Sequence, residues 1–160
     1  MVILQIPSAI YDAMVAHAKQ NMPLEACGYL AGETPSSTPS QAGENGEDPK
    51  GVRPLDPAVA TVFIPMTNID KSPEHFTFDP KEQFAAIKQV RQSGESLLAV
   101  YHSHPETPAR LSAEDVRLFN DPNMIYVIVS LAAAIPEVKA YRVRKHEDVV
   151  NIVRVDIVVS

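Results

Sequence analysis

The segment with the most chemical content is 102–105, His-Ser-His-Pro, which is followed by Ser112 and Asp115. Side chains alternate along an extended chain, so His102 and His104 point to one side, about 6.6 Å apart along the strand. Two imidazoles in that relation can bind one cation, and a helix that begins at Ser112 directs Asp115 back toward them. Two histidines, a carboxylate and a fourth position left to water are typical of a catalytic zinc site.

Each half of this pattern also has a simpler explanation. An isolated His-x-His is more often accidental or structural than a pair of metal ligands. The segment 112–115, Ser-Ala-Glu-Asp, is also a capping box, which needs no metal. The metal site is favoured because both features occur together, at the end of an expected strand and at the start of the next helix. The capping role of Ser112 is compatible with a chemical one, since a cap can orient a hydroxyl.

The string from His102 to Asp115 resembles the complete signature of the JAMM (MPN+) metallopeptidase family. That family also needs a glutamate upstream, and the segment 23–32, Pro-Leu-Glu-Ala-Cys-Gly-Tyr-Leu-Ala-Gly, is similar to the matching segment, with Glu25 in the catalytic position. The resemblance covers nearly the whole chain except 33–57 and the C-terminal end. It implies a single JAMM/MPN domain over residues 1–160, an α/β fold of the cytidine-deaminase-like kind with a mixed β-sheet flanked by helices.

The resemblance also implies roles for individual residues. His102, His104 and Asp115 would bind Zn²⁺, with a water as the fourth ligand. Glu25 would take a proton from that water and later deliver it to the leaving amine, while Ser112 would donate a hydrogen bond to the developing oxyanion. General chemistry agrees, because zinc lowers the pKa of water to about 7 and a nearby carboxylate then produces hydroxide at neutral pH. Without the resemblance, Glu25 would be interpreted as a solvated carboxylate at a helix end.

The resemblance to compact members of the family also implies a substrate class. Family members cut an amide that follows the C-terminal Gly-Gly tail of ubiquitin-like proteins, and those without insertions beside the histidine motif resemble prokaryotic members that act on sulfur-carrier proteins. We therefore expect a zinc metallopeptidase, or isopeptidase, whose partner is such a carrier. Two alternatives stay open. One is a non-catalytic MPN scaffold or binding module, against which the retained site residues argue, and the other is a general small-peptide hydrolase.

Length and composition agree with one globular enzyme. A chain of 160 residues is expected to form a single domain. Its 20 acidic and 14 basic residues give a formal charge of −6, which does not suit nucleic-acid binding. No apolar run approaches the length of a membrane span, and the N-terminus lacks the features of a signal peptide. We expect a soluble, cytoplasmic protein that binds no membrane, with an oligomeric state that the sequence does not reveal.

The elements that must position these residues are marked by apolar spacing and by helix caps. Strands are expected at 2–6, 27–31, 60–65, 97–101, 125–131, 139–144 and 149–159, and helices at 8–20, at 79–94 and from 112 onward. The second helix is the clearest, because Asp79 suits the N-cap, Pro80 the first turn and Gly94 the exit. Its expected buried stripe is Phe84, Ile87 and Val90.

Residues 33–57 carry almost nothing that a core could bury. Such a composition cannot offset its own ordering entropy, which predicts a flexible loop within the domain. The loop is either a tolerated surface insertion or a flap over a substrate groove.

Other reactive residues receive weaker interpretations. Cys27, the only cysteine, excludes an intramolecular disulfide and is expected to be an inert buried residue rather than a nucleophile. A cytidine-deaminase site is excluded because the Pro-Cys-x-x-Cys element is missing. Asn68 is either a turn residue or part of the cleft. His17, on or near the polar side of the first helix, and His75 and His146, in expected loops, are assigned no role.

Overall fold

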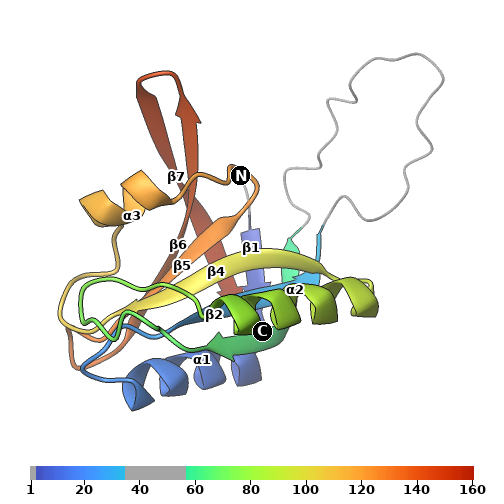
Figure 1. Cartoon of the computed structure of the whole chain (residues 1–160), viewed down its shortest axis with the longest axis horizontal. Coiled ribbons are helices and arrows are strands. Elements are labelled where there is room, and N and C mark those ends of the chain that lie inside the picture. Colours follow the sequence, from blue (N-terminus) through green and yellow to red (C-terminus); the bar gives the residue numbers. More distant parts are fainter. Residues whose placement is uncertain (1–2, 35–56) are drawn as a thin grey trace.

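The computed structural model describes residues 3–34 and 57–160. Within these two ranges, seven strands and three helices follow one another: β1 (Ile3–Ile6), α1 (Ser8–Gln20), β2 (Cys27–Glu33), β3 (Ala58–Met66), α2 (Pro80–Ser93), β4 (Ser96–His104), α3 (Ala113–Leu118), β5 (Ile125–Ser130), β6 (Glu137–His146) and β7 (Val149–Val159). The helices lie around the sheet, and the β6–β7 hairpin projects from the body (Figure 1). The predicted α/β class, with a mixed sheet flanked by helices, is confirmed.

The sheet closes on itself. Its strand order is β1-β3-β2-β4-β5-β6-β7, and β1 also pairs with the far end of β7. The contacts of β1 with β3 and with β7 are parallel, as is the β4–β5 contact, while the remaining pairs are antiparallel. The alternation of apolar residues predicts the strands but not this ring closure, because pairing between the two ends of a chain leaves no local pattern.

One parallel pair arranges the region around the histidines. Strand β4 ends at His104, and the chain then passes through α3 before β5 starts beside Ala99. Parallel neighbours require such a crossover, since the chain must return to the opposite end of the sheet. The crossover therefore begins where β4 ends, which places the start of α3 next to the histidines.

Helix α2 confirms its predicted ends and, within its predicted buried stripe, the burial of Val90, whereas Ile87 is partly buried and Phe84 is not buried. The Asp79 carboxylate accepts hydrogen bonds from the backbone N–H groups of Lys81 and Glu82, and Gly94 closes the helix in the left-handed region with φ of 75°. Phe84, however, is 72% exposed, and the fully buried positions are Ala86 and Val90.

The reason for this difference is the close approach of α2 to the sheet. Ala86 packs in a cluster with Cys27, Tyr29 and Met66, where a small side chain lets the helix lie near β2 and β3. The side-chain amide of Gln83 donates to the Tyr29 hydroxyl at 3.0 Å, which fixes the rotation of the helix. The prediction that Phe84 is buried is therefore wrong, because it considers only that the side chain is apolar.

Strand β2 lies between β3 and β4 in the closed sheet and runs two residues beyond its predicted end. The predicted loop at 33–57 begins within this strand at Glu33, and apart from Thr34 and Pro57 the rest of it lies outside the described residues. None of the helices in the described ranges is long and apolar enough to cross a bilayer.

Gly28 in β2 should not tolerate a side chain. A Cβ built there meets the backbone carbonyl oxygen of Ile64, whereas a Cβ at Gly94 meets nothing. We expect Gly28→Ala to lower the free energy of unfolding by roughly 2–3 kcal/mol through overpacking. Gly94→Ala should cost about 1 kcal/mol, from the left-handed backbone alone. Urea denaturation measures both, and equal losses would show that the β2–β3 contact is not the limiting one.

Candidate metal centre

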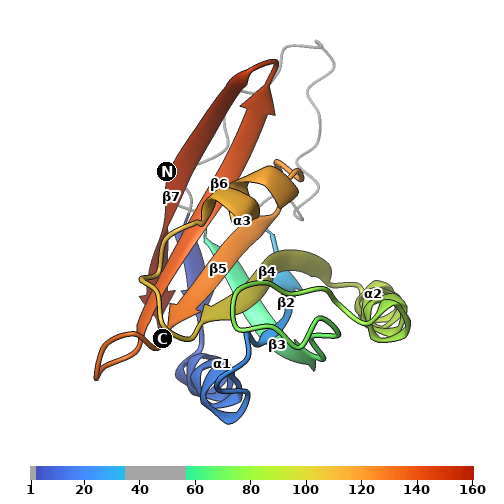
Figure 2. The ribbon, with the colours of Figure 1, turned by 60° about the vertical axis from the view of Figure 1, so that its left-hand side comes forward.

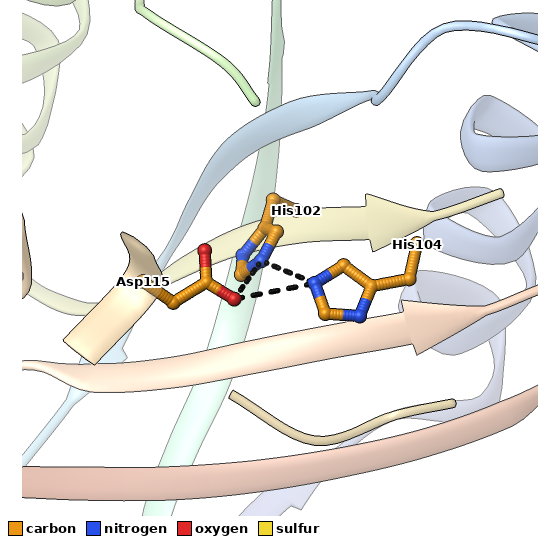
Figure 3. Close-up of side chains that lie close together, drawn as sticks. All are labelled: His102, His104 and Asp115. Atoms are coloured by element: carbon orange, nitrogen blue, oxygen red, sulfur yellow. Dashed lines mark hydrogen bonds and ion pairs between the residues drawn. The ribbon is translucent and has the colours of Figure 1, made fainter. Parts of the chain in front are cut away.

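Two histidines and one aspartate converge at the end of β4. The Nε2 atoms of His102 and His104 lie 3.1 Å apart, and Asp115 Oδ2 lies 3.3 Å from the first and 3.2 Å from the second (Figure 3). All three residues are buried. The side chains come from the C-terminal end of β4 and the first turn of α3, as the sequence pattern predicts.

The triangle of ligand atoms has the dimensions of a zinc site. Zinc binds nitrogen and oxygen ligands at about 2.0–2.1 Å in tetrahedral geometry, which places neighbouring ligand atoms about 3.3–3.4 Å apart. The three observed separations are 3.1–3.3 Å. Two imidazole nitrogens and one carboxylate oxygen also match the donor chemistry of that ion. The residues therefore fit a zinc ion with one coordination position left open.

The orientation of the His104 ring is fixed by its other nitrogen. His104 Nδ1 lies 2.9 Å from the carbonyl oxygen of Pro108. A carbonyl can only accept, so Nδ1 carries the hydrogen and the Nε2 lone pair points at the convergence point. The loop that holds this carbonyl is itself fixed, because the Ser130 hydroxyl donates to the Thr107 carbonyl at 2.6 Å and the Tyr141 hydroxyl to that of Ala109 at 2.7 Å.

The His102 ring is held by aromatic packing. It stacks on Phe76 with the ring centroids 4.9 Å apart, and Phe119 meets it edge-on at 5.6 Å. Burial lowers the pKa of His102, although Asp115 acts in the opposite direction. The ring is therefore kept neutral, which is the form that binds a metal. Its Nδ1 has no hydrogen-bond partner within the described part of the chain.

The predicted capping box at the start of α3 is present and is part of the site. Ser112 Oγ accepts from the Asp115 backbone N–H at 3.0 Å, and Asp115 Oδ2 accepts from the Ser112 N–H at 3.0 Å. Burial raises the pKa of Asp115, but the contacts with His102 and His104 and the hydrogen bond from the Ser112 N–H outweigh it and hold that pKa well below its usual range. Because Ser112 Oγ serves as an acceptor, its own hydrogen stays available for donation.

Glu25 lies beside this centre. The Ala26 N–H donates to Ser103 Oγ at 2.7 Å and the Ser103 N–H donates to the Ala26 carbonyl at 2.9 Å, so Ser103, between the two histidines, holds the residue that follows Glu25. The Glu25 side chain is 3% exposed, and its Oε1 has no hydrogen-bond partner in the described structure. Burial raises its pKa to about 8, against the attraction of His104. A buried carboxyl with a raised pKa, within electrostatic reach of His104, is suited to proton transfer.

Asn68 is a turn residue that also contacts the backbone of Glu25, while a place in the cleft stays a prediction. Its side-chain amide donates to the Glu25 carbonyl at 3.1 Å and to the His75 carbonyl at 3.0 Å. Its Oδ1 accepts from the N–H groups of Asp70 and Thr77, so Asn68 organises a turn as well. The loop that Asn68 orders carries Phe76, whose ring stacks on His102. The sequence contains no signal for that stacking or for Ser103, because both depend on contacts between distant segments.

The remaining reactive residues take no part in the centre. Cys27 is fully buried and burial raises the pKa of its thiol to about 12, which confirms the inert interpretation. His17 is half-buried rather than on the polar side of α1, with Nδ1 at 3.1 Å from the Tyr101 hydroxyl. His75 is exposed and pairs with Asp70 at 2.9 Å.

The family is shown by direct comparison. Residues 7–144 match the family model Prok-JAB, prokaryotic homologs of the JAB domain. The chain therefore belongs to the prokaryotic JAB family, as the resemblance in its sequence predicts.

Three curated relatives carry names that describe cleavage. The CysO-cysteine peptidase of Mycobacterium tuberculosis (strain ATCC 25618 / H37Rv) is 34% identical over 128 residues, which are 80% of this chain and 73% of the relative. The desampylase of Haloferax volcanii is 25% identical, over 79% of this chain and 80% of the relative. The probable TtuB-protein conjugate cleaving protease of Thermus thermophilus is 28% identical, over 72% of this chain and 62% of the relative. The chain is a hydrolase of the peptidase class.

Solved structures agree with the fold. Protein DSY2949 from Desulfitobacterium hafniense has 36% identity and a TM-score of 0.74, with 99% of this chain and 93% of that one covered. The JAB1/MPN domain protein AF2198 from Archaeoglobus fulgidus, at 19% identity, has a TM-score of 0.51 with 97% and 96% covered, which supports the fold alone.

The buried carboxyl of Glu25 should destabilise the metal-free protein at high pH. Its folded pKa of about 8 lies above the ordinary value of 4.5, so the folded state binds the proton more tightly than the unfolded state. The associated stability is complete below pH 4.5 and is lost as the pH rises toward 8. We expect the free energy of unfolding of chelator-treated Glu25→Gln to rise relative to that of the parent over this range, by on the order of a few kcal/mol at pH 8.

Thermal unfolding between pH 5 and pH 8 measures this difference. The exposed Glu106→Gln variant is the matched control and should follow the parent protein at every pH. Parallel curves for Glu25→Gln and the parent would mean that the Glu25 carboxyl is solvated in the folded state.

Proposed function

We propose that this protein is a zinc-dependent metallopeptidase that hydrolyses the amide following the C-terminal Gly-Gly tail of a ubiquitin-like or sulfur-carrier protein. The observation that carries the proposal is the convergence of His102 Nε2, His104 Nε2 and Asp115 Oδ2 on one point, with separations of 3.1–3.3 Å. The carboxyl of Glu25 is buried and near enough to the centre for the charges of His104 and Asp115 to act on its pKa. The family and the names of the relatives support the same class of reaction.

We assign the metal to His102, His104 and Asp115. Zinc bound there would supply a Lewis acid and a water with a pKa near 7. The Pro108 carbonyl keeps the His104 lone pair directed inward, and burial keeps His102 uncharged. The Ser112 N–H fixes the Asp115 oxygen that would serve as the third ligand. These contacts preorganise the ligands before a metal arrives, which reduces the cost of binding it.

We assign general base and acid catalysis to Glu25. Ionised, it removes a proton from the attacking water, and protonated, it delivers that proton to the leaving amine. A pKa near neutrality suits both directions, because the group must accept and release within one cycle. The free hydrogen of the Ser112 hydroxyl would donate to the oxyanion of the tetrahedral intermediate, which such donors stabilise.

The substrate assignment depends on the relatives and on the compactness of the chain. One relative is named for the CysO-cysteine conjugate and another for conjugates of TtuB. By the family resemblance we infer a carrier of this kind, with an extended Gly-Gly tail that pairs with exposed backbone near the site. We also propose that residues 1–160 act as one domain, and a cytoplasmic location stays a prediction.

Replacing one proposed ligand should release the metal. We expect His104→Ala to lose stoichiometric zinc, because two remaining ligands cannot hold it at micromolar concentration. Elemental analysis of the purified protein measures the zinc per chain. His75→Ala, which removes an exposed histidine outside the centre, is the matched control and should retain the metal. Full zinc occupancy in His104→Ala would remove this residue from the ligand set.

Replacing the proposed base should separate metal binding from turnover. We expect Glu25→Gln to keep zinc but to lose about 10²–10⁴-fold in rate, because a neutral amide cannot accept the proton. The assay incubates the protein with carrier–amine fusions ending in Gly-Gly, with and without chelator, and reads products by intact mass.

The same assay distinguishes the alternatives. Cleavage that needs both the tail and the metal supports the proposal, with Glu106→Gln as the control that keeps activity. Cleavage of short peptides regardless of any tail would indicate a general small-peptide hydrolase. A metal-free protein that binds the carrier without cleaving it would indicate a scaffold.

A further inference from the structure

The hairpin formed by β6 and β7 extends beyond the closed part of the sheet. Only the last four residues of β7, Asp156–Val159, pair with β1. The first part of β7 pairs with β6 alone, so its outer backbone edge meets no other strand within the described residues. The projection of this hairpin from the body is visible in two views (Figures 1 and 2).

The free segment of β7 is apolar on both of its faces. Val149, Val150, Ile152 and Val153 are each 44–58% exposed. Val149 and Val153 continue the face of the core residue Val155 past the end of the barrel, while Val150 and Ile152 lie on the opposite face. An edge strand of this kind, with β-branched residues and unpaired backbone groups, is suited to pairing with another strand.

We propose that this edge pairs antiparallel with the same edge of a second copy of the chain, about a two-fold axis at Asn151. In that register Val149 faces Val153 of the second copy and Val150 faces its Ile152. Asp148 faces Arg154 of the other chain, and the two-fold axis repeats every pair. Moving the axis by one residue, to Ile152, would instead place Val150 opposite Arg154. The sequence of the edge is therefore self-complementary in one register.

The gain for each chain is a wider sheet. Strand β6 already has support from the region of α3, because Val143 packs with Phe119 and Lys145 Nζ donates to the Arg117 carbonyl at 3.1 Å. The free part of β7 pairs with β6 alone, and three or more strands are more stable than two. Pairing at the two-fold axis converts two projecting hairpins into one four-stranded sheet with the order β6-β7-β7-β6. Apolar side chains would then meet cross-strand partners on both faces.

The location of this edge argues against a carrier tail as its occupant. Strand β6 runs antiparallel to β5 and leaves the sheet at the end opposite His104: Lys139 lies beside Ile128, the residue paired with His102, and the tip is at His146. Seven residues of extended strand span about 23 Å. A tail bound along the free part of β7 would therefore end far from the candidate metal centre.

The oligomeric state of the full chain tests this inference independently of the proposed function. Light scattering after size exclusion should give twice the 17.5 kDa of one chain. Ile152→Lys should return the mass to that of one chain, because it places two charges against valines at the interface. Val158→Lys is the matched control: Val158 is on the same strand and also 48% exposed, but lies where β7 pairs with β1, and its variant should stay dimeric.

Cross-linking tests the register. Asn151→Cys should form an intermolecular disulfide on mild oxidation, because the two residues 151 lie opposite each other at the axis. Val153→Cys should not, since its copies would lie about 13 Å apart along the strands. The buried Cys27 leaves these reporters as the accessible thiols of the described structure.

Three results would overturn the inference. They are a single-chain mass for the parent at tens of micromolar, a dimer that persists in Ile152→Lys, or a disulfide through Val153→Cys in place of Asn151→Cys. If the parent were monomeric and bound a Gly-Gly carrier, and if Ile152→Lys abolished that binding, the carrier would be the occupant of this edge. Unchanged zinc content and thermal midpoint in Ile152→Lys establish that the exposed substitution leaves the fold intact.

Discussion

The arrangement of this domain is governed by three electron-rich side-chain atoms that are held close together inside the protein. His102 Nε2, His104 Nε2 and Asp115 Oδ2 lie within 3.3 Å of each other in a buried region, where water cannot separate them. Such a set repels itself unless a proton or a cation occupies the centre. The rest of the domain must therefore supply enough packing and hydrogen bonding to keep these groups together. A metal ion that enters the centre would relieve this repulsion, which strengthens its binding.

Much of that support comes from backbone groups. The Pro108 carbonyl, the Ser112 N–H and the Ala26 peptide each hold one side chain or segment of the centre. Backbone positions are set by the closed sheet and by the β4–β5 crossover, so the geometry is inherited from the fold. A buried glutamate with a raised pKa adds a local cost, which is typical of sites where stability is exchanged for reactivity.

The sequence predicts the convergence of His102, His104 and Asp115 because these residues are close in the chain. The spacing between His102 and His104, and the capping box at Ser112, encode local geometry that alternation and helix caps explain. The sequence places Glu25 only through its family resemblance, since the contact between Ala26 and Ser103 joins segments that are far apart. The ring closure between β1 and β7 and the stacking of Phe76 are unpredictable for the same reason. Phe84 was placed on the wrong face, because apolarity does not reveal how closely a helix approaches a sheet.

The burial of the single cysteine has a consequence for the thiol chemistry of the protein. Thiol–disulfide exchange requires a thiolate that can reach its partner. Cys27 offers neither, since it is enclosed by the central strands and holds its proton at any physiological pH. The folded protein should therefore form no mixed disulfides through Cys27. Oxidants and alkylating reagents should likewise leave this side chain untouched while the protein is folded.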